Sequence, residues 1–106
     1  MPWYYYAAYF FVGALLANAP VHFLQGTSGN KFQTPFASPR GGESSAVVNV
    51  VWGWFNFVVA GALMWFFPVP LLPPLAVAAV AMLGALVLAV YLASRFGKVR
   101  TAAPHP

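Results

Sequence analysis

The stretch that decides the fold is AVVNVVWGWFNFVVAGALMWFF, residues 46–67, which contains no charged side chain. A helix of this length is about 33 Å long, close to the roughly 30 Å hydrocarbon core of a bilayer. Two similar uncharged runs, at about residues 3–24 and 75–94, precede and follow it in the chain. The sequence therefore predicts an all-α polytopic membrane protein with three transmembrane helices in a small bundle.

The composition indicates that lipid surrounds most of the chain. Hydrophobic residues make up 61% of the 106 residues and charged residues only 6%. Soluble domains carry about 25% charged residues, so this chain has too few to cover a globular surface. The absence of cysteine excludes disulfides and thiolate metal ligands. We expect a single transmembrane domain over residues 1–106, with no cofactor and no metal.

Proline, glycine and serine mark the segments between the helices. Residues 68–74, PVPLLPP, predict a short external turn, because proline lacks the N–H that a helix needs. Residues 25–45 predict a long polar loop, and Ser44 and Ser45 can cap the helix that follows. Pro20 either ends or kinks the first helix, and the sequence leaves both alternatives open.

Positive charge predicts the orientation in the membrane. All 5 Lys and Arg residues lie in the 25–45 loop or in the 95–106 tail. Basic residues stay on the cytoplasmic side in short loops. We therefore predict a bacterial inner-membrane protein with its N-terminus out and its loop and tail in the cytoplasm. This bias accounts for the net charge of +4, and we expect no nucleic-acid partner.

Polar side chains inside the apolar runs form the candidate site. Polar groups are costly in hydrocarbon, so they face protein or water. If the polar faces of the first two helices meet, their side chains gather beneath the 25–45 loop. The predicted intramembrane cluster consists of Asn18, His22, Asn49 and Asn56.

Helical spacing places this cluster on one face of each helix, because residues three or four positions apart share a face. On the second helix this face holds Asn49, Trp52, Gly53, Asn56 and Ala60. On the first helix it holds Ala7, Phe11, Ala14, Asn18 and His22.

Three interpretations of the cluster stay open. As a link between helices, polar contacts of this kind contribute about 0.6 kcal/mol on average and up to about 1.7. As the lining of a channel or transporter, the four side chains would form a polar path. In an intramembrane enzyme, His22 and Glu43 would act as an acid–base pair. No catalytic sequence motif is present, so we assign no catalytic residue.

Small residues mark a candidate helix-packing seam. They recur every four residues along the third helix, and small residues let helix backbones approach closely. The seam packs either within the chain or against another copy or subunit. It consists of Gly53, Ala81, Gly84, Ala85, Ala89 and Ala93.

The 25–45 loop is also a candidate for binding an anionic lipid headgroup or a phosphate. Glycine-rich backbone before a helix N-terminus can hold an anion with the help of the helix dipole. Glu43 opposes such binding while it is ionised, and the alternative is a solvated connector. The candidate contacts are Lys31, Arg40, Ser44 and Ser45.

These features predict a small multi-pass inner-membrane protein that acts as a homo-oligomer or as an accessory subunit of a membrane complex. Helix packing and the cytoplasmic loop would supply the contacts, and the lipid bilayer would surround the bundle. The first alternative is a small oligomeric channel or transporter. The second alternative is an intramembrane enzyme.

Overall fold

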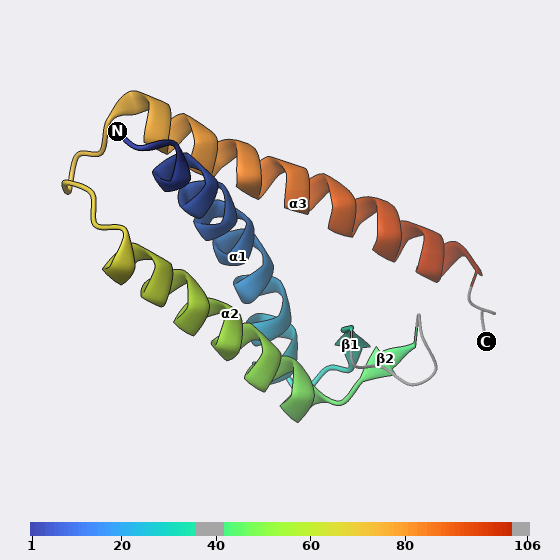
Figure 1. Cartoon of the computed structure of the whole chain (residues 1–106). Helices are drawn as coiled ribbons and strands as arrows, with labels where there is room; N and C mark the ends of the chain where they lie inside the picture. The colour runs from blue at the N-terminus through green and yellow to red at the C-terminus, as the bar shows by residue number, and fades with distance from the viewer. Residues whose placement is uncertain (36–41, 103–106) are drawn as a thin grey trace.

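Three long helices and one pair of short strands make up the described part of the chain, residues 1–35 and 42–102 of a computed structural model (Figure 1). The elements are α1 (Trp3–Thr27), β1 (Phe32–Gln33), β2 (Glu43–Ser44), α2 (Ala46–Phe66) and α3 (Leu75–Ala102). The strands pair antiparallel, with Phe32 opposite Ser44. All three helices are long and apolar enough to cross a membrane, as the sequence predicts.

α1 lies between the other two helices. It packs against α2 and against α3, whereas α2 and α3 make few contacts with each other. In Figure 1 the N-terminus and the turn between α2 and α3 lie at one end of the bundle. The β1–β2 pair and the C-terminal part of α3 lie toward the other end. The described parts of the loop and of the predicted tail thus lie toward the same end of the bundle.

α1 continues through Pro20 to Thr27, beyond the predicted end at residue 24. A proline removes one backbone hydrogen bond, but packing on its C-terminal side can hold the helix together. Gly26 shows this packing, because a Cβ atom there would lie only 2.5 Å from the carbonyl oxygen of Ala46. The helix therefore does not end at Pro20, and the loop begins later than predicted.

α3 continues to Ala102, well beyond the predicted end at residue 94. The prediction followed the apolar run, which marks the part of a helix suited to lipid and not the helix itself. Arg and Lys are good helix formers, so a basic segment can prolong an apolar helix. The span-like part of α3 is Leu75–Arg95, and the start of the predicted tail is helical.

The apolar core lies toward the end of the bundle that holds the N-terminus. Its buried members come from α1 and α3 and are Ala8, Tyr9, Val12 and Val77. The Tyr9 hydroxyl donates a hydrogen bond of 2.8 Å to the carbonyl oxygen of Phe67, directly after α2. This bond ties the first helix to the end of the second.

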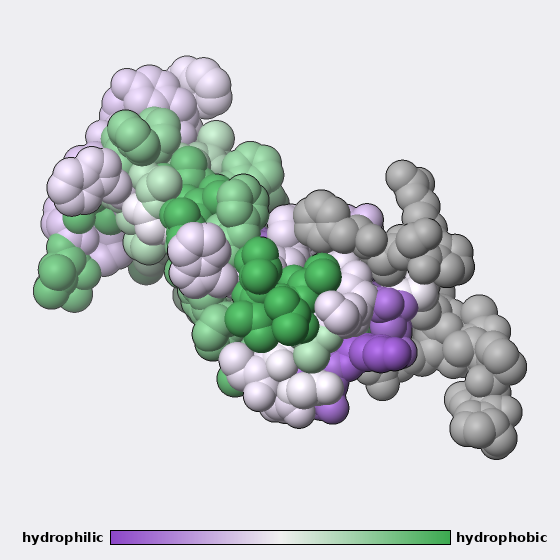
Figure 2. Space-filling view, turned by 90° about the horizontal axis from the view of Figure 1, so that it is seen from below, coloured by the Kyte–Doolittle hydropathy of each residue, from purple (hydrophilic) through white to green (hydrophobic). Residues whose placement is uncertain are grey.

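The outer surface of the bundle is apolar over most of its length. Figure 2 shows hydrophobic residues along the helices, with the most hydrophilic ones gathered toward the end of the β1–β2 pair. Large side chains are exposed on both α2 and α3, for example Trp54 and Trp65 on α2 and Met82 on α3. Such a surface suits lipid or a protein partner, because neither requires polar groups.

Candidate functional site

Four polar side chains form a continuous hydrogen-bonded network between α1 and α2. His22 Nδ1 lies 3.0 Å from Asn49 Oδ1, and His22 Nε2 lies 3.2 Å from Asn18 Oδ1. Asn18 Nδ2 donates to Asn56 Oδ1 at 3.1 Å. The structure thus brings together all four residues of the predicted intramembrane cluster.

The network is buried. The exposed fraction is 0% for Asn49, 2% for His22 and for Asn56, and 9% for Asn18. A buried polar group that lacks a partner costs about 1–3 kcal/mol. The contacts among the four side chains therefore make their burial between the helices possible.

Backbone carbonyl groups hold both ends of the network. Asn49 Nδ2 lies 3.0 Å from the carbonyl oxygens of Phe32 and Ser45, and 3.2 Å from that of Ser44. At the other end, Asn56 Nδ2 donates to the carbonyl oxygen of Trp52 at 2.7 Å. Asn49 thus joins both strands of the loop to α2, which the sequence alone did not predict.

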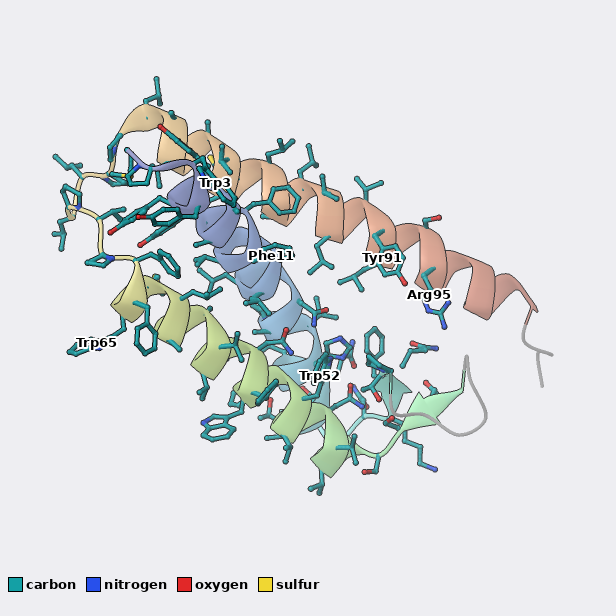
Figure 3. All side chains as sticks on the ribbon, in the orientation of Figure 1. Trp3, Phe11, Trp52, Trp65, Tyr91 and Arg95 are labelled. Carbon is teal, nitrogen blue, oxygen red and sulfur yellow. The ribbon has the colours of Figure 1, made fainter. Side chains whose placement is uncertain are left out.

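Aromatic rings flank the imidazole of His22. The ring centroid of Phe32 lies 5.7 Å from that of His22, and the ring centroid of Trp52 lies 6.4 Å away. Figure 3 labels Trp52 toward the end of the bundle that holds the β1–β2 pair. Phe32 is buried although it belongs to the polar loop. A side chain from β1 thus packs against His22. The described start of this loop is therefore ordered and covers the network.

The predicted polar face of α1 is correct only near the loop. Ala7 and Phe11 are exposed, and Ala8, Tyr9 and Val12 are buried in their place. The prediction assumed that α1 has one contact face. Because α1 packs between two helices, its buried surface changes direction along the helix, and a single 3.6-residue pattern misses this.

The described candidate anion contacts have different surroundings and different hydrogen-bond partners. Lys31 is exposed. Ser44 is buried, and its hydroxyl group forms a hydrogen bond with that of Thr34. Ser45 caps α2, because its hydroxyl oxygen accepts from the backbone N–H of Val48 at 3.2 Å. Arg40 lies outside the described residues. Both serine hydroxyls are thus already used within the chain.

The proposed acid–base pair does not form in the described part of the chain. His22 is buried, whereas Glu43 lies on β2 with an exposed side chain and makes no hydrogen bond or ion pair with it. No group of three or more His, Cys, Asp or Glu residues that could hold a metal ion occurs within residues 1–35 and 42–102. The chemistry that the network offers is hydrogen bonding and the holding of a proton.

The residues of the predicted seam divide between the two sides of α1. Gly53 faces α1 from α2, where a Cβ atom would lie 2.6 Å from the backbone nitrogen of Phe23. Gly84 faces α1 from α3, where a Cβ atom would lie 1.9 Å from the carbonyl oxygen of Phe10. Ala81 and Ala85 are half-buried, whereas Ala89 and Ala93 are exposed. The seam therefore packs within the chain at its start and is open farther along α3.

Gly13 belongs to this contact, although we did not predict it. A Cβ atom at Gly13 would overlap the carbonyl oxygen of Ala81. Gly13 and Gly84 thus face the opposite backbone from either side of the same contact. A glycine inside an apolar helix was the available signal, because small residues mark close approach between membrane helices.

Comparison of the chain with protein families, with curated proteins and with solved structures finds no match.

Proposed function

We propose that this chain is a small multi-pass protein of the bacterial inner membrane that acts as a homo-oligomer or as an accessory subunit of a membrane complex. The observation that carries the proposal is the uncovered surface of α3. Only 11% of its span-like stretch is buried, against 33% in α1 and 22% in α2. A helix that is apolar all round and covered on one side needs lipid or protein on the others.

The closed polar network supports a structural role. The four side chains of the network bond to one another and to backbone carbonyl groups. Beyond Asn56 the next buried position on α2 is Ala60, and the apolar core of α1 begins at Val12. A polar path through the chain would need polar groups at that end as well. The network supports the channel interpretation less than it supports helix association.

The open part of α3 supports lateral association. Ala89 and Ala93 are exposed on one flank of the helix, and small residues there allow another helix to approach closely. Large side chains cover the opposite flank, for example Leu83 and Val87. The small-residue flank is the side on which a second copy or a foreign subunit fits.

A matched pair of variants tests this proposal. Ala89→Trp places bulk on the small-residue flank, and Val87→Trp places the same bulk about 160° away on the same helix. We expect the first variant to dissociate the assembly and the second to leave it intact. The measurement is native mass spectrometry of protein extracted from its own membrane in a mild detergent. A wild-type protein that is strictly monomeric and free of partners in detergent and in lipid would contradict the proposal.

The orientation is a separate part of the proposal. The β1–β2 pair and the basic part of α3 share one end of the bundle, which supports a common cytoplasmic side for loop and tail. Because the chain has no cysteine, single cysteines can be introduced at Lys31 and at Leu72. We expect a membrane-impermeant thiol reagent added to intact cells to label position 72 only. Labelling of position 31 alone would show that the orientation is opposite to the one we propose.

A further inference from the structure

The hydrogen-bond network around His22 requires one more hydrogen than a neutral histidine supplies. Asn49 presents one amide atom to three backbone carbonyl oxygens, at distances of 3.0 to 3.2 Å. Carbonyl oxygens only accept, so this atom must be the NH₂ nitrogen. The amide oxygen of Asn49 therefore faces His22 Nδ1.

The same reasoning applies from the other end of the network. Asn56 presents one amide atom to the carbonyl oxygen of Trp52 at 2.7 Å, so this atom is also a nitrogen. The oxygen of Asn56 then faces Asn18, which must donate to it through its own nitrogen. The oxygen of Asn18 is left to face His22 Nε2.

Both ring nitrogens of His22 consequently face amide oxygens, which can only accept. A neutral imidazole carries one N–H and one lone pair, whereas the imidazolium carries two N–H groups. In the neutral form, one ring nitrogen would present a lone pair to an oxygen about 3 Å away. Rotation of Asn18 does not remove this conflict, because it moves the clash to the contact with Asn56.

We propose that His22 is a proton-binding site, and that the proton taken up at Nε2 completes the network between α1, α2 and the loop. In the neutral form the remaining proton stays on Nδ1. Asn49 is held by three carbonyl groups and cannot turn, and its oxygen lies closer to the ring than that of Asn18. Release of the proton therefore weakens the link between His22 and Asn18 specifically.

The other charged and titratable groups described around the site are not buried, so His22 is the buried proton acceptor of the network. α2 contributes none over Ala46–Phe66. In the described part of the loop, Lys31 and Glu43 are both exposed. On α3, Tyr91 and Arg95 are exposed and point toward the side of the β1–β2 pair in Figure 3. No carboxylate of the described residues pairs with His22. The amide oxygens of Asn49 and Asn18 therefore accept from the protonated ring in place of a carboxylate.

Nitrogen NMR tests the proposal directly. In a His105→Gln background His22 is the single histidine, because the chain contains 2. With ¹⁵N-labelled histidine in lipid bilayers, the shift of each ring nitrogen reports whether it carries a proton. We expect a proton on Nδ1 at every pH between about 5 and 9 at which the fold persists, and an added proton on Nε2 at the acidic end. Protons on both ring nitrogens over the whole of this pH range would also support the proposal.

Two results would overturn the proposal. One is a neutral form with its proton on Nε2 and a bare Nδ1. The other is an Nε2 that never takes up a proton while the protein stays folded.

A remote variant separates this proposal from simple burial of a histidine. Asn56 does not touch His22, but it fixes the orientation of Asn18. In Asn56→Leu the Asn18 amide can rotate and donate to a neutral Nε2, so we expect proton binding to weaken at least about tenfold. Val58→Ala, on the exposed side of α2, should leave the titration unchanged. An unchanged midpoint in Asn56→Leu would show that the amide chain does not set the protonation of His22.

Discussion

The two contacts that α1 makes with its neighbours use different chemistry. Against α2 it forms a network of amide and imidazole hydrogen bonds around His22. Against α3 it packs a small apolar core around Val77 and brings the two backbones into close approach at Gly13 and Gly84. In lipid there is no hydrophobic force between helices, so packing and hydrogen bonds must hold them together. Glycines allow close backbone approach on both sides of α1, and the hydrogen-bonded network adds polar contacts on the side of α2.

The difference between these contacts concerns specificity. Hydrogen bonds between particular side chains fix the rotation and register of α1 against α2, because a shifted helix would leave buried amides without partners. A shift of α3 along α1 would instead bring a Cβ atom against backbone where Gly13 and Gly84 now lie, so steric contact restricts this pair. Because α3 leaves most of its span-like stretch uncovered, it is the helix on which we propose that a partner binds.

The largest expected effect comes from the glycine contact. Gly13→Val would place side-chain atoms where the backbone of Ala81 lies, and backbone cannot move aside cheaply. We expect a loss of about 3 kcal/mol in the free energy of unfolding, because overpacking against a rigid neighbour has a cost of this order. The measurement is reversible unfolding in lipid bicelles. Gly61→Val is the matched control, since a Cβ atom there meets nothing within 4 Å. Equal losses in both variants would show that close approach at Gly13 is not the cause.

The same contrast explains how much of the fold the sequence predicts. Three spans and a polar loop follow directly from the apolar runs, because length and charge decide what can cross a bilayer. The meeting of Asn18 and His22 with Asn49 and Asn56 follows from spacing on two helices. Each of these predictions depends on the pattern of a single helix or on the match between one face of each of two helices.

Two of the features that the sequence did not predict depend on contacts among three elements. Phe32 in the loop packs against His22 where Asn49 bonds to both strands of the loop, and a two-residue strand leaves almost no pattern in a sequence. The exposure of Phe11 depends on α1 having neighbours on two sides. Such relations come from tertiary packing, which overrides a single periodic pattern.

The next largest effect concerns the polar contact. Asn49→Leu would remove the partner of His22 and the donor to three loop carbonyl groups. We expect a loss of about 2 kcal/mol, because the substitution removes the buried hydrogen bonds from Asn49 to His22 and to the loop. Hydrogen exchange of the loop amides should also accelerate. Asn30→Leu is the control, since the exposed side chain of Asn30 donates to the side chain of Gln25 and not to the network. If loop exchange does not change in Asn49→Leu, the loop is held by other contacts.

A single hydrogen bond at the opposite end tests whether the apolar part of the bundle also needs polar support. Tyr9→Phe removes the hydroxyl that donates to the Phe67 carbonyl group at 2.8 Å and keeps the ring. We expect a loss of about 1 kcal/mol in the free energy of unfolding. Tyr4→Phe, at a largely exposed ring, should change it by less than about 0.5 kcal/mol. A loss as large as that of Asn49→Leu would mean that the apolar end of the bundle depends on hydrogen bonds as much as the end that holds the network.

The smallest effect is the coupling between the two asparagines that join α1 to α2. In a double-mutant cycle of Asn18→Ala and Asn56→Ala, we expect a coupling of about 0.6 kcal/mol, the average for such bonds between membrane helices. The reference cycle pairs Asn18→Ala with Val58→Ala on the exposed side of α2, and its coupling should be close to zero. A coupling well above about 1.7 kcal/mol would exceed what one bond supplies in lipid. It would mean that the network acts as one unit, so that loss of the Asn18–Asn56 link also disturbs His22 and the loop.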